Sequence, residues 1–347
     1  MLLDTPLAPL PALTPKRAPE ARDPWLDNAR FGLIALVLFG HLLEPLLARH
    51  PGLAACYRAV YAFHMPAFAF LSGAVASARM DRRVVKGVLL RLLLPYLVFQ
   101  GLYGLAAEWQ GWPDDGPHGI ATPYWLLWYL LSLACWRLLL PFFARLPGRL
   151  WIAVAIALVA GCISEIGYYL SLSRTLVFLP MFLLGWQQAQ HWRDFGTRPN
   201  ARWLALATLV GLFCAGFLSK LDPRWLYGSY DYASLGVEPL VGATVRLLLI
   251  GCSMAGTWAF LALVPRRRLT LSALGARSEG AYLLQGFLIN LAVGAGVFAA
   301  LRQLPRPMLA PLLLTSAALM AAALSSRHVH RLLVAPITAP RWLERRL

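Results

Sequence analysis

The sequence predicts an all-α protein: a polytopic membrane helix bundle of about ten transmembrane helices, with both termini in the cytoplasm. Of its 347 residues, 59% are apolar and only 14% are charged, whereas soluble domains carry about 25% charged residues. The charged residues gather in short clusters separated by runs of roughly 18 or more nearly uncharged residues, which is enough to cross a hydrocarbon core. The formal charge of +16 follows this topology, so no nucleic-acid partner is predicted.

The apolar runs define ten predicted spans in chain order. They cover residues 31–49, 57–78, 84–106, 123–144, 150–170, 174–190, 202–219, 241–264, 281–301 and 308–325. With a cytoplasmic amino terminus, 23 of the 32 Lys and Arg residues fall in cytoplasmic segments and 8 in outer segments. This asymmetry supports the orientation and the even number of spans. Arg137 falls within a span, and we expect it to reach the cytoplasmic interface.

Two tails flank the transmembrane region. Residues 1–24 are rich in Pro, Ala and Leu and lack the features of a secretory signal, so we expect a flexible cytoplasmic tail. Residues 25–325 form one transmembrane domain, and residues 326–347 form a basic cytoplasmic tail. The five Cys residues lack paired or metal-ligand spacing, and His328 and His330 lack partners, so no metal site is predicted.

Two histidines lie at depth in the predicted membrane region. His41 is about halfway along the first span, and His64 is about a third of the way into the second, counted from the outer end. Ionisable side chains are costly in lipid, so each is a candidate functional residue. Adjacent antiparallel helices would bring the two together near mid-membrane. The alternative interpretation is that each imidazole is a satisfied interior polar group that holds helices together.

The first histidine follows a distinctive string, Trp25-Leu26-Asp27-Asn28-Ala29-Arg30. Eleven residues separate Arg30 from His41, which is about three helical turns, so both project from nearly the same face with a rise of roughly 16 Å. A guanidinium at the cytoplasmic rim suits phosphate, and a thioester on a long arm would reach the histidine. Alternatively, Arg30 is a positive-inside anchor. Asp27 either pairs with Arg30 or caps the helix, and Glu44 either orients His41 or lies at the waterside.

The second histidine lies in the string Phe63-His64-Met65-Pro66-Ala67-Phe68, which runs on to Ser72-Gly73. Pro66 removes one backbone hydrogen bond within the span, which in membranes often accompanies a cavity or a kink. Ser72 and Gly73 permit close approach of a second helix.

These strings together resemble the membrane acyltransferase type 3 family, and within it the fucose 4-O-acetyltransferase-like group. The resemblance covers about residues 25 to 325 and rests on the order and spacing of several motifs. Besides the Arg30-x10-His41 and Phe63-to-Gly73 strings, these are Arg91-Leu92-Leu93-Leu94-Pro95-Tyr96, Pro123-Tyr124-Trp125-Leu126-Leu127, Arg174-Thr175-Leu176-Val177-Phe178-Leu179-Pro180 and Tyr282-Leu283-Leu284-Gln285-Gly286.

The resemblance implies an inner-membrane enzyme that moves an acyl group, usually acetyl, from cytoplasmic acyl-CoA to a carbohydrate hydroxyl. Carried onto this sequence, His41 would be the essential histidine, acting as general base or as acyl carrier. Arg30 would bind acetyl-CoA, with Asp27 beside it. His64 and Arg91 would be further residues of the pocket. Family members often carry His at the position of Gln285, which leaves the role of that residue open.

Two predicted outer loops are candidates for binding the sugar through carboxylates and aromatic faces. One, at about residues 107–122, carries Glu108, Asp114, Asp115 and His118; the other, at about residues 220–240, carries Asp222, Asp231, Tyr227, Tyr230 and Tyr232. Solvated loop ends are the alternative interpretation. A transporter or flippase is the rival function, because spans interrupted by Pro and Gly with buried histidines also suit alternating access. A scaffold for an envelope-polymer assembly complex is a third possibility.

Overall fold

The computed structural model describes residues 22–111 and 119–338, and within these ranges the chain forms helices and no β-strand. Seven helical segments of the described chain are long and apolar enough to cross a membrane. They are Pro24–Ala48, Arg82–Gln110, Trp125–Phe143, Tyr169–Phe195, Ala201–Leu218, Pro239–Leu263 and Arg306–Leu324. The predicted fold class, an all-α polytopic membrane bundle, is therefore confirmed. Most of the predicted tails, residues 1–21 and 339–347, lie outside the described residues.

The long helices alternate with shorter helical pieces. In chain order the principal helices are α1 (Pro24–Leu43), α2 (Pro51–Tyr61), α3 (His64–Ala74), α4 (Arg82–Val88), α5 (Leu94–Gln110), α6 (Trp128–Phe143), α7 (Arg149–Val159), α8 (Leu172–Phe195), α9 (Ala201–Leu218), α10 (Arg224–Tyr227), α11 (Pro239–Leu263), α12 (Ser272–Gly275), α13 (Glu279–Gly294), α14 (Val297–Leu301) and α15 (Arg306–Leu324). Short 3-10 turns include η1 (Glu44–Arg49), which extends α1, η3 (Trp125–Leu127), which leads into α6, and η4 (Ala160–Cys162), η5 (Ser164–Ile166) and η6 (Tyr169–Ser171) between α7 and α8.

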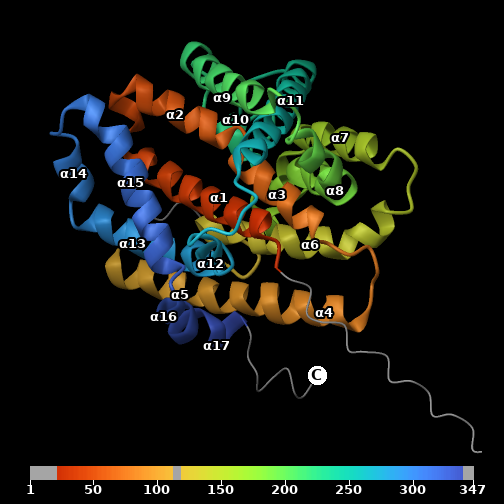
Figure 1. Ribbon diagram of the computed structural model, residues 1–347, viewed down its shortest axis with the longest axis horizontal. Coiled ribbons are helices and arrows are strands. Elements are labelled where there is room, and N and C mark those ends of the chain that lie inside the picture. The colour runs from red at the N-terminus through yellow and green to blue at the C-terminus, as the bar shows by residue number, and fades with distance from the viewer. Residues whose placement is uncertain (1–21, 112–118, 339–347) are drawn as a thin grey trace, which may run out of the picture.

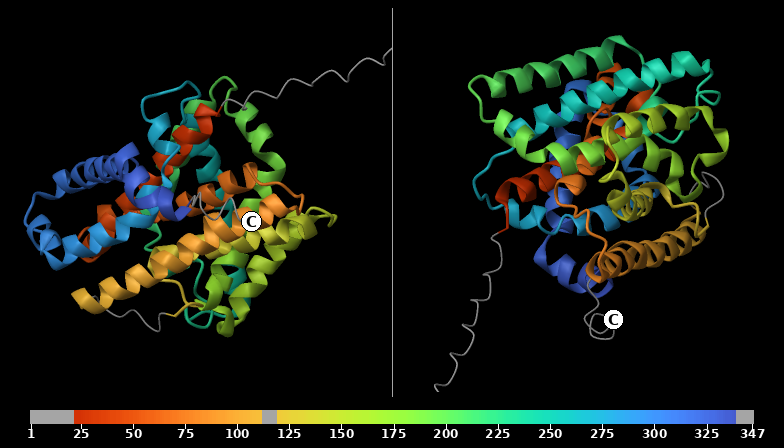
Figure 2. Two further views of the ribbon diagram at one scale, coloured as in Figure 1. Left: turned by 90° about the horizontal axis from the view of Figure 1, so that it is seen from below. Right: turned by 90° about the vertical axis from the view of Figure 1, so that its right-hand side faces the viewer.

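Helix α1 occupies the middle of the bundle, with α13, α14 and α15 on one side and α3, α6 and α8 on the other (Figure 1). It contacts α15, α12, α2 and α3. Helices α9 and α11 lie side by side at one edge, as both figures show (Figure 2). Many of their large apolar side chains are exposed, such as Trp203 and Leu248, and such surfaces suit contact with lipid. The central position of α1 places its polar residues inside the protein.

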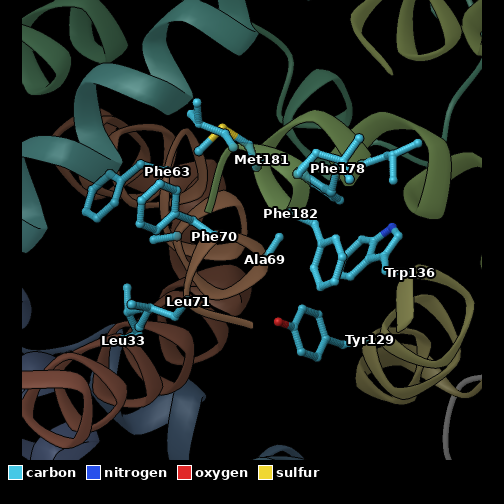
Figure 3. Close-up of a cluster of buried hydrophobic side chains, with 14 of the residues drawn as sticks. Leu33, Phe63, Ala69, Phe70, Leu71, Tyr129, Trp136, Phe178, Met181 and Phe182 are labelled. Atoms are coloured by element: carbon cyan, nitrogen blue, oxygen red, sulfur yellow. The ribbon is translucent and has the colours of Figure 1, made fainter. Parts of the chain in front are cut away.

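Helices α3 and α8 pack closely because glycines meet backbone at their crossing. A Cβ atom on Gly73 would overlap the carbonyl oxygen of Phe182, and one on Gly185 would overlap that of Phe70. Large aromatic side chains of α3, α6 and α8 fill the surrounding core, where Trp136 stacks on Phe182 (Figure 3). Close approach through small residues is a common way of packing helices in membranes. This crossing fixes the position of the His64 segment.

The predicted span 57–78 is not one continuous helix. Helix α2 ends at Tyr61 and α3 begins at His64, after two residues in a turn. Proline is tolerated in the first turn of a helix, where its missing N–H has no intrahelical partner, and Pro66 lies in the first turn of α3. The proline thus follows the break, and His64 stands at the start of a new helix.

Two more expectations differ from the structure in detail. The predicted span 281–301 is divided into α13 and α14 at Gly296, whose positive φ of 71° suits glycine. Residues 327–338, expected within a basic tail, form the short helices α16 (Arg327–Val329), η7 (His330–Val334) and α17 (Ala335–Thr338). Segment η7 contacts α13 and α17 contacts α5, and Val334 is fully buried. An apolar side chain of this segment therefore anchors it to the bundle.

Candidate active site in the central cavity

The string that begins α1 fastens the helix to the loop after α11. The Trp25 indole donates to the carbonyl of Leu261 at 3.2 Å. The Asn28 amide donates to the carbonyls of Pro265 and Arg267 at 2.8 and 3.0 Å, and its oxygen accepts from the Ser272 hydroxyl at 2.6 Å. These bonds tie the first turn of α1 to the end of α11 and to the segment that follows it, so they fix the start of α1 and with it the position of Arg30.

Arg30 and Asp27 form an ion pair at the same end of α1. One Arg30 nitrogen lies 3.3 Å from an Asp27 carboxylate oxygen, and the second carboxylate oxygen lies 3.8 Å from Arg22. Asp27 is buried, whereas the Arg30 side chain is 30% exposed and lines a large cavity. In this geometry Asp27 orients Arg30, and the Arg30 guanidinium remains accessible to a ligand in the cavity.

His41, three turns along α1, is enclosed by a carboxylate and an indole. Its Nδ1 lies 3.5 Å from Oε2 of Glu44, and its ring meets the Trp125 ring edge-on with centroids 4.3 Å apart. The other Glu44 oxygen accepts from the Tyr57 hydroxyl at 3.4 Å. A carboxylate accepts hydrogen bonds, so in the tautomer that donates from Nδ1 to Glu44 the Nε2 atom keeps its lone pair. That lone pair is available to take a proton from a substrate.

His64 is bound to the helix break that precedes it. Its Nδ1 donates to the carbonyl of Val60 at 2.9 Å, and the same carbonyl accepts the backbone N–H of Phe63 at 3.1 Å. The imidazole is buried and meets the edge of the Tyr61 ring, with centroids 4.6 Å apart. This hydrogen bond also leaves Nε2 unprotonated in the neutral ring. One ring nitrogen of His64 therefore has a structural partner, while Nε2 remains available to a ligand in the cavity.

Arg91 lies in a π-helical turn, η2 (Leu89–Leu93), between α4 and α5. The turn has a local cause, because Pro95 has no N–H to donate to the carbonyl four residues earlier, which belongs to Arg91, and its ring crowds that oxygen. Such π-turns often occur at functional sites. The wider turn presents Arg91 to the cavity that Arg30 lines.

One cavity of 1420 Å³ brings four of the five predicted site residues together. Arg30, His41, His64 and Arg91 all line it, and the fifth, Asp27, stands behind Arg30. Arg30 and His41 therefore share a passage, separated along α1 by a rise of about 16 Å. In the described chain, no group of three or more His, Cys, Asp or Glu residues has an arrangement that would hold a metal ion.

Only some of the predicted sugar-binding residues of the 220–240 loop line the same cavity. Tyr227 and Tyr230 line the cavity. Asp222 pairs with Arg224 at 2.7 Å, and the hydrogen bond from that guanidinium lowers the pKa of the Asp222 carboxyl. Asp231 accepts from Ser234, and Tyr232 is buried against neighbouring backbone. The two aspartates therefore bind their own loop.

The two cavity tyrosines of this loop are neutral hydroxyl groups at physiological pH. Burial raises the pKa of Tyr227 to about 12, and a hydrogen bond with Tyr168 is the largest reason that the pKa of Tyr230 rises to about 12. Both therefore stay hydrogen-bond donors and acceptors. In the other candidate loop Glu108 lines the cavity, whereas Asp114, Asp115 and His118 lie outside the described residues.

Three cavity residues were not predicted from the sequence as members of the site. Trp125 packs on His41, and its φ of 22° is rare for a residue other than glycine. Tyr61 lies between His64 and Tyr227, and Arg174 reaches in from α8. The motifs Pro123-to-Leu127 and Arg174-to-Pro180 were visible in the sequence, but no local periodicity showed that they meet α1.

The fold and the cavity define a multi-pass membrane protein in which imidazole and guanidinium groups line one internal cavity. Comparison with known proteins assigns its class. A family model described as an acyltransferase domain matches residues 23–326. Because this match covers most of the chain, the protein belongs to the acyltransferase 3 family. The predicted resemblance is confirmed at this level, and the chain is identified as a membrane acyltransferase.

Two curated relatives match over most of their length. Nodulation protein NolL of Sinorhizobium fredii is 27% identical over 299 residues, which are 78% of this chain and 79% of the relative. Nodulation protein NolL of Mesorhizobium japonicum is 28% identical over 301 residues, or 80% of this chain and 77% of the relative. No solved structure shows significant similarity to the chain.

Proposed function

We propose that the protein transfers an acyl group, acetyl in the first instance, from cytoplasmic acyl-CoA to a hydroxyl of a cell-envelope or exported carbohydrate. The observation that carries the proposal is the shared cavity, which joins the guanidinium groups of Arg30 and Arg91 to the imidazole of His41. The charge asymmetry of the sequence supports an inner-membrane orientation in which Arg30 faces the cytoplasm. The resemblance to the fucose 4-O-acetyltransferase-like group favours a sugar as the acceptor.

Arginine is suited to the donor because its planar fork stays charged and binds phosphate through paired hydrogen bonds. Asp27 holds Arg30 at 3.3 Å without covering it, since the Arg30 side chain remains 30% exposed. With the phosphates at Arg30 and Arg91, the flexible arm of acyl-CoA would lie along the cavity, and its thioester would reach His41.

In the proposed reaction the Nε2 lone pair of His41 removes the proton from the sugar hydroxyl. The hydroxyl oxygen attacks the thioester carbonyl carbon, a new C–O bond forms and the C–S bond breaks. The imidazolium returns the proton to the departing sulfur, which leaves as the free thiol of CoA. Glu44, 3.5 Å from Nδ1, stabilises the imidazolium charge while it lasts. His64 supplies a second unprotonated nitrogen in the same cavity, and we assign it a supporting position there.

The test uses the full chain in nanodiscs, with release of the CoA thiol from acetyl-CoA as the readout. We expect His41→Ala to lower kcat by about 100-fold or more, because a positioned general base contributes at least that factor. Arg30→Gln should raise KM for acetyl-CoA about tenfold and leave KM for S-acetylpantetheine, which lacks the nucleotide phosphates, unchanged.

Arg202→Gln is the matched control, because Arg202 is an exposed cation on α9 that does not line the cavity. It should alter neither constant. Equal turnover in wild type and His41→Ala would contradict the proposal, and so would transport of a sugar across proteoliposomes without thiol release. Mass spectrometry of envelope glycans from cells with and without the protein then identifies the acylated sugar.

A further inference from the structure

Arg174 is a cation in the central cavity that the proposed transfer does not use. It belongs to the first turn of α8 and lines the cavity beside Tyr61 and Tyr227. Its Nε donates to the carbonyl of Tyr227 at 3.2 Å, and one Nη donates to the hydroxyl of Ser229 at 3.4 Å. The guanidinium also faces two aromatic rings, those of Trp128 at 5.2 Å and Tyr168 at 4.9 Å. It is therefore held in place by several elements at once.

All of these contacts are made to uncharged groups. None of the Asp and Glu residues in the described chain forms an ion pair with Arg174. An uncompensated charge inside a membrane protein is costly and usually serves a function. Carbonyl, hydroxyl and ring contacts orient this cation and leave its charge without a counter-ion.

Arg246 shows what a structural arginine looks like in the same protein. It is buried in α11, donates to the carbonyls of Ala157 and Tyr230 at 3.2 and 2.8 Å, and lies over the Tyr232 ring. Arg246 does not line the cavity, and these two hydrogen bonds go to backbone carbonyls of the surrounding structure. The difference at Arg174 is its access to the cavity, which lets its guanidinium meet a ligand.

Arg174 is connected to His41 by a short series of contacts. His41 meets Glu44, and Glu44 accepts from the Tyr57 hydroxyl. That hydroxyl lies 2.9 Å from the Tyr227 hydroxyl, and the Tyr227 carbonyl accepts from Arg174. Arg30, in contrast, lies three helical turns from His41 in the direction of the amino terminus. A donor whose phosphates occupy Arg30 and whose thioester reaches His41 ends before Arg174, so this region is left to the acceptor.

We propose that Arg174 and the aromatic rings around it form the acceptor subsite, and that the acceptor is an acidic carbohydrate whose carboxylate or phosphate binds this guanidinium. The inference rests on the proposed function, because it assumes that a sugar is the acceptor. The partly exposed rings of Tyr168 and Tyr230 offer apolar faces to the C–H faces of a sugar, while the guanidinium fork fits an oxyanion through paired hydrogen bonds. Neutral sugars gain only the first of these interactions.

The test measures the dissociation constants of three sugars for the full chain in nanodiscs by isothermal titration calorimetry. Methyl β-glucuronide carries a carboxylate, glucose 1-phosphate carries a phosphate, and methyl β-glucoside is the neutral reference. Wild type should bind at least one charged sugar about tenfold more tightly than the neutral one, as expected for a charge-assisted hydrogen bond. The charged sugar that shows this preference identifies the source of the oxyanion.

Arg174→Gln should abolish the preference, and Arg174→Lys should keep part of it. The control Arg246→Gln should keep all of it, although its unfolding temperature falls. The proposal is overturned by equal affinity for the three sugars, by a failure of both charged sugars to bind, or by a charge preference that survives in Arg174→Gln. It is also overturned if, with no sugar present, Arg174→Gln lowers the hydrolysis of acetyl-CoA as strongly as His41→Ala does. The guanidinium would then act in the chemical step and not in binding the acceptor.

Failure of this inference and failure of the proposed function are distinguishable. If wild type releases no thiol and His41→Ala behaves identically, the acyltransfer proposal fails whatever the sugars do. If thiol release depends on His41 but no charged sugar is preferred, only the acidic acceptor is wrong.

Discussion

Glu44→Gln tests the arrangement around His41 most directly, because it removes one charge with little change of shape. Two unit charges 3.5 Å apart interact by about 1.2 kcal/mol in bulk water and by about 5 kcal/mol at an effective dielectric constant of 20. The Glu44 side chain is 37% exposed, so solvent screening keeps the interaction with an imidazolium at the low end, at about 1–2 kcal/mol. The expected loss in kcat is therefore roughly 5- to 30-fold, measured as thiol release from acetyl-CoA.

A double-mutant cycle separates this effect from a general disturbance of the cavity. In a His41→Ala background, Glu44→Gln should cost nothing further, because the charge that Glu44 stabilises never forms. Tyr57→Phe, which removes the hydroxyl that donates to Glu44 at 3.4 Å, should cause a smaller loss than Glu44→Gln. Equal losses in the wild-type and His41→Ala backgrounds would refute the reasoning, as would a Glu44→Gln variant with unchanged kcat.

Two further variants test helix packing and one buried polar side chain of the cavity. Gly73→Ala should lower the free energy of unfolding by about 1–3 kcal/mol, because its Cβ would overlap the Phe182 backbone. Gly101→Ala, at a position with open space around it, is the control. Thermal unfolding of both variants in detergent is the measurement, and equal unfolding temperatures would disprove the prediction. Gln285→Leu should raise the unfolding temperature yet weaken acetyl-CoA binding several-fold. The reason is that Gln285 lines the cavity and its buried Oε1 has no protein partner in the described chain. A variant that binds acetyl-CoA as tightly as wild type would exclude this role.

The sequence predicted the part of the site that one helix carries. The eleven-residue step between Arg30 and His41 fixes their common face by helix geometry alone, and the structure places both on one cavity. The anchoring of that helix also rests on local residues, since Trp25 and Asn28 bind the loop after α11. Regular helices transmit such spacing without help from the rest of the fold.

The parts that the sequence did not predict depend on contacts between distant segments. Nothing near Arg174 indicates that its carbonyl partner is Tyr227, more than fifty residues later. Hydropathy did not show that a helix break precedes His64 and places Pro66 in the first turn of α3. Nor did it show that Val334, in the 327–338 segment, is buried in the bundle. Each of these features is determined by tertiary packing, which cannot be predicted from the apolar composition of the sequence alone.

The proposed division of the cavity would keep donor and acceptor recognition separate within one bundle. A single helix, α1, carries both Arg30 and His41, so the separation between the proposed phosphate site and the proposed base is set by helix rise. The proposed acceptor side combines Trp128 of α6, Arg174 of α8 and Tyr227 of α10. Substitutions in those three helices can therefore change which sugar is bound while the donor arm keeps its geometry. A family with a constant donor and varied acceptors would gain from such a separation, because the chemistry stays on one rigid element while the recognition surface is free to change.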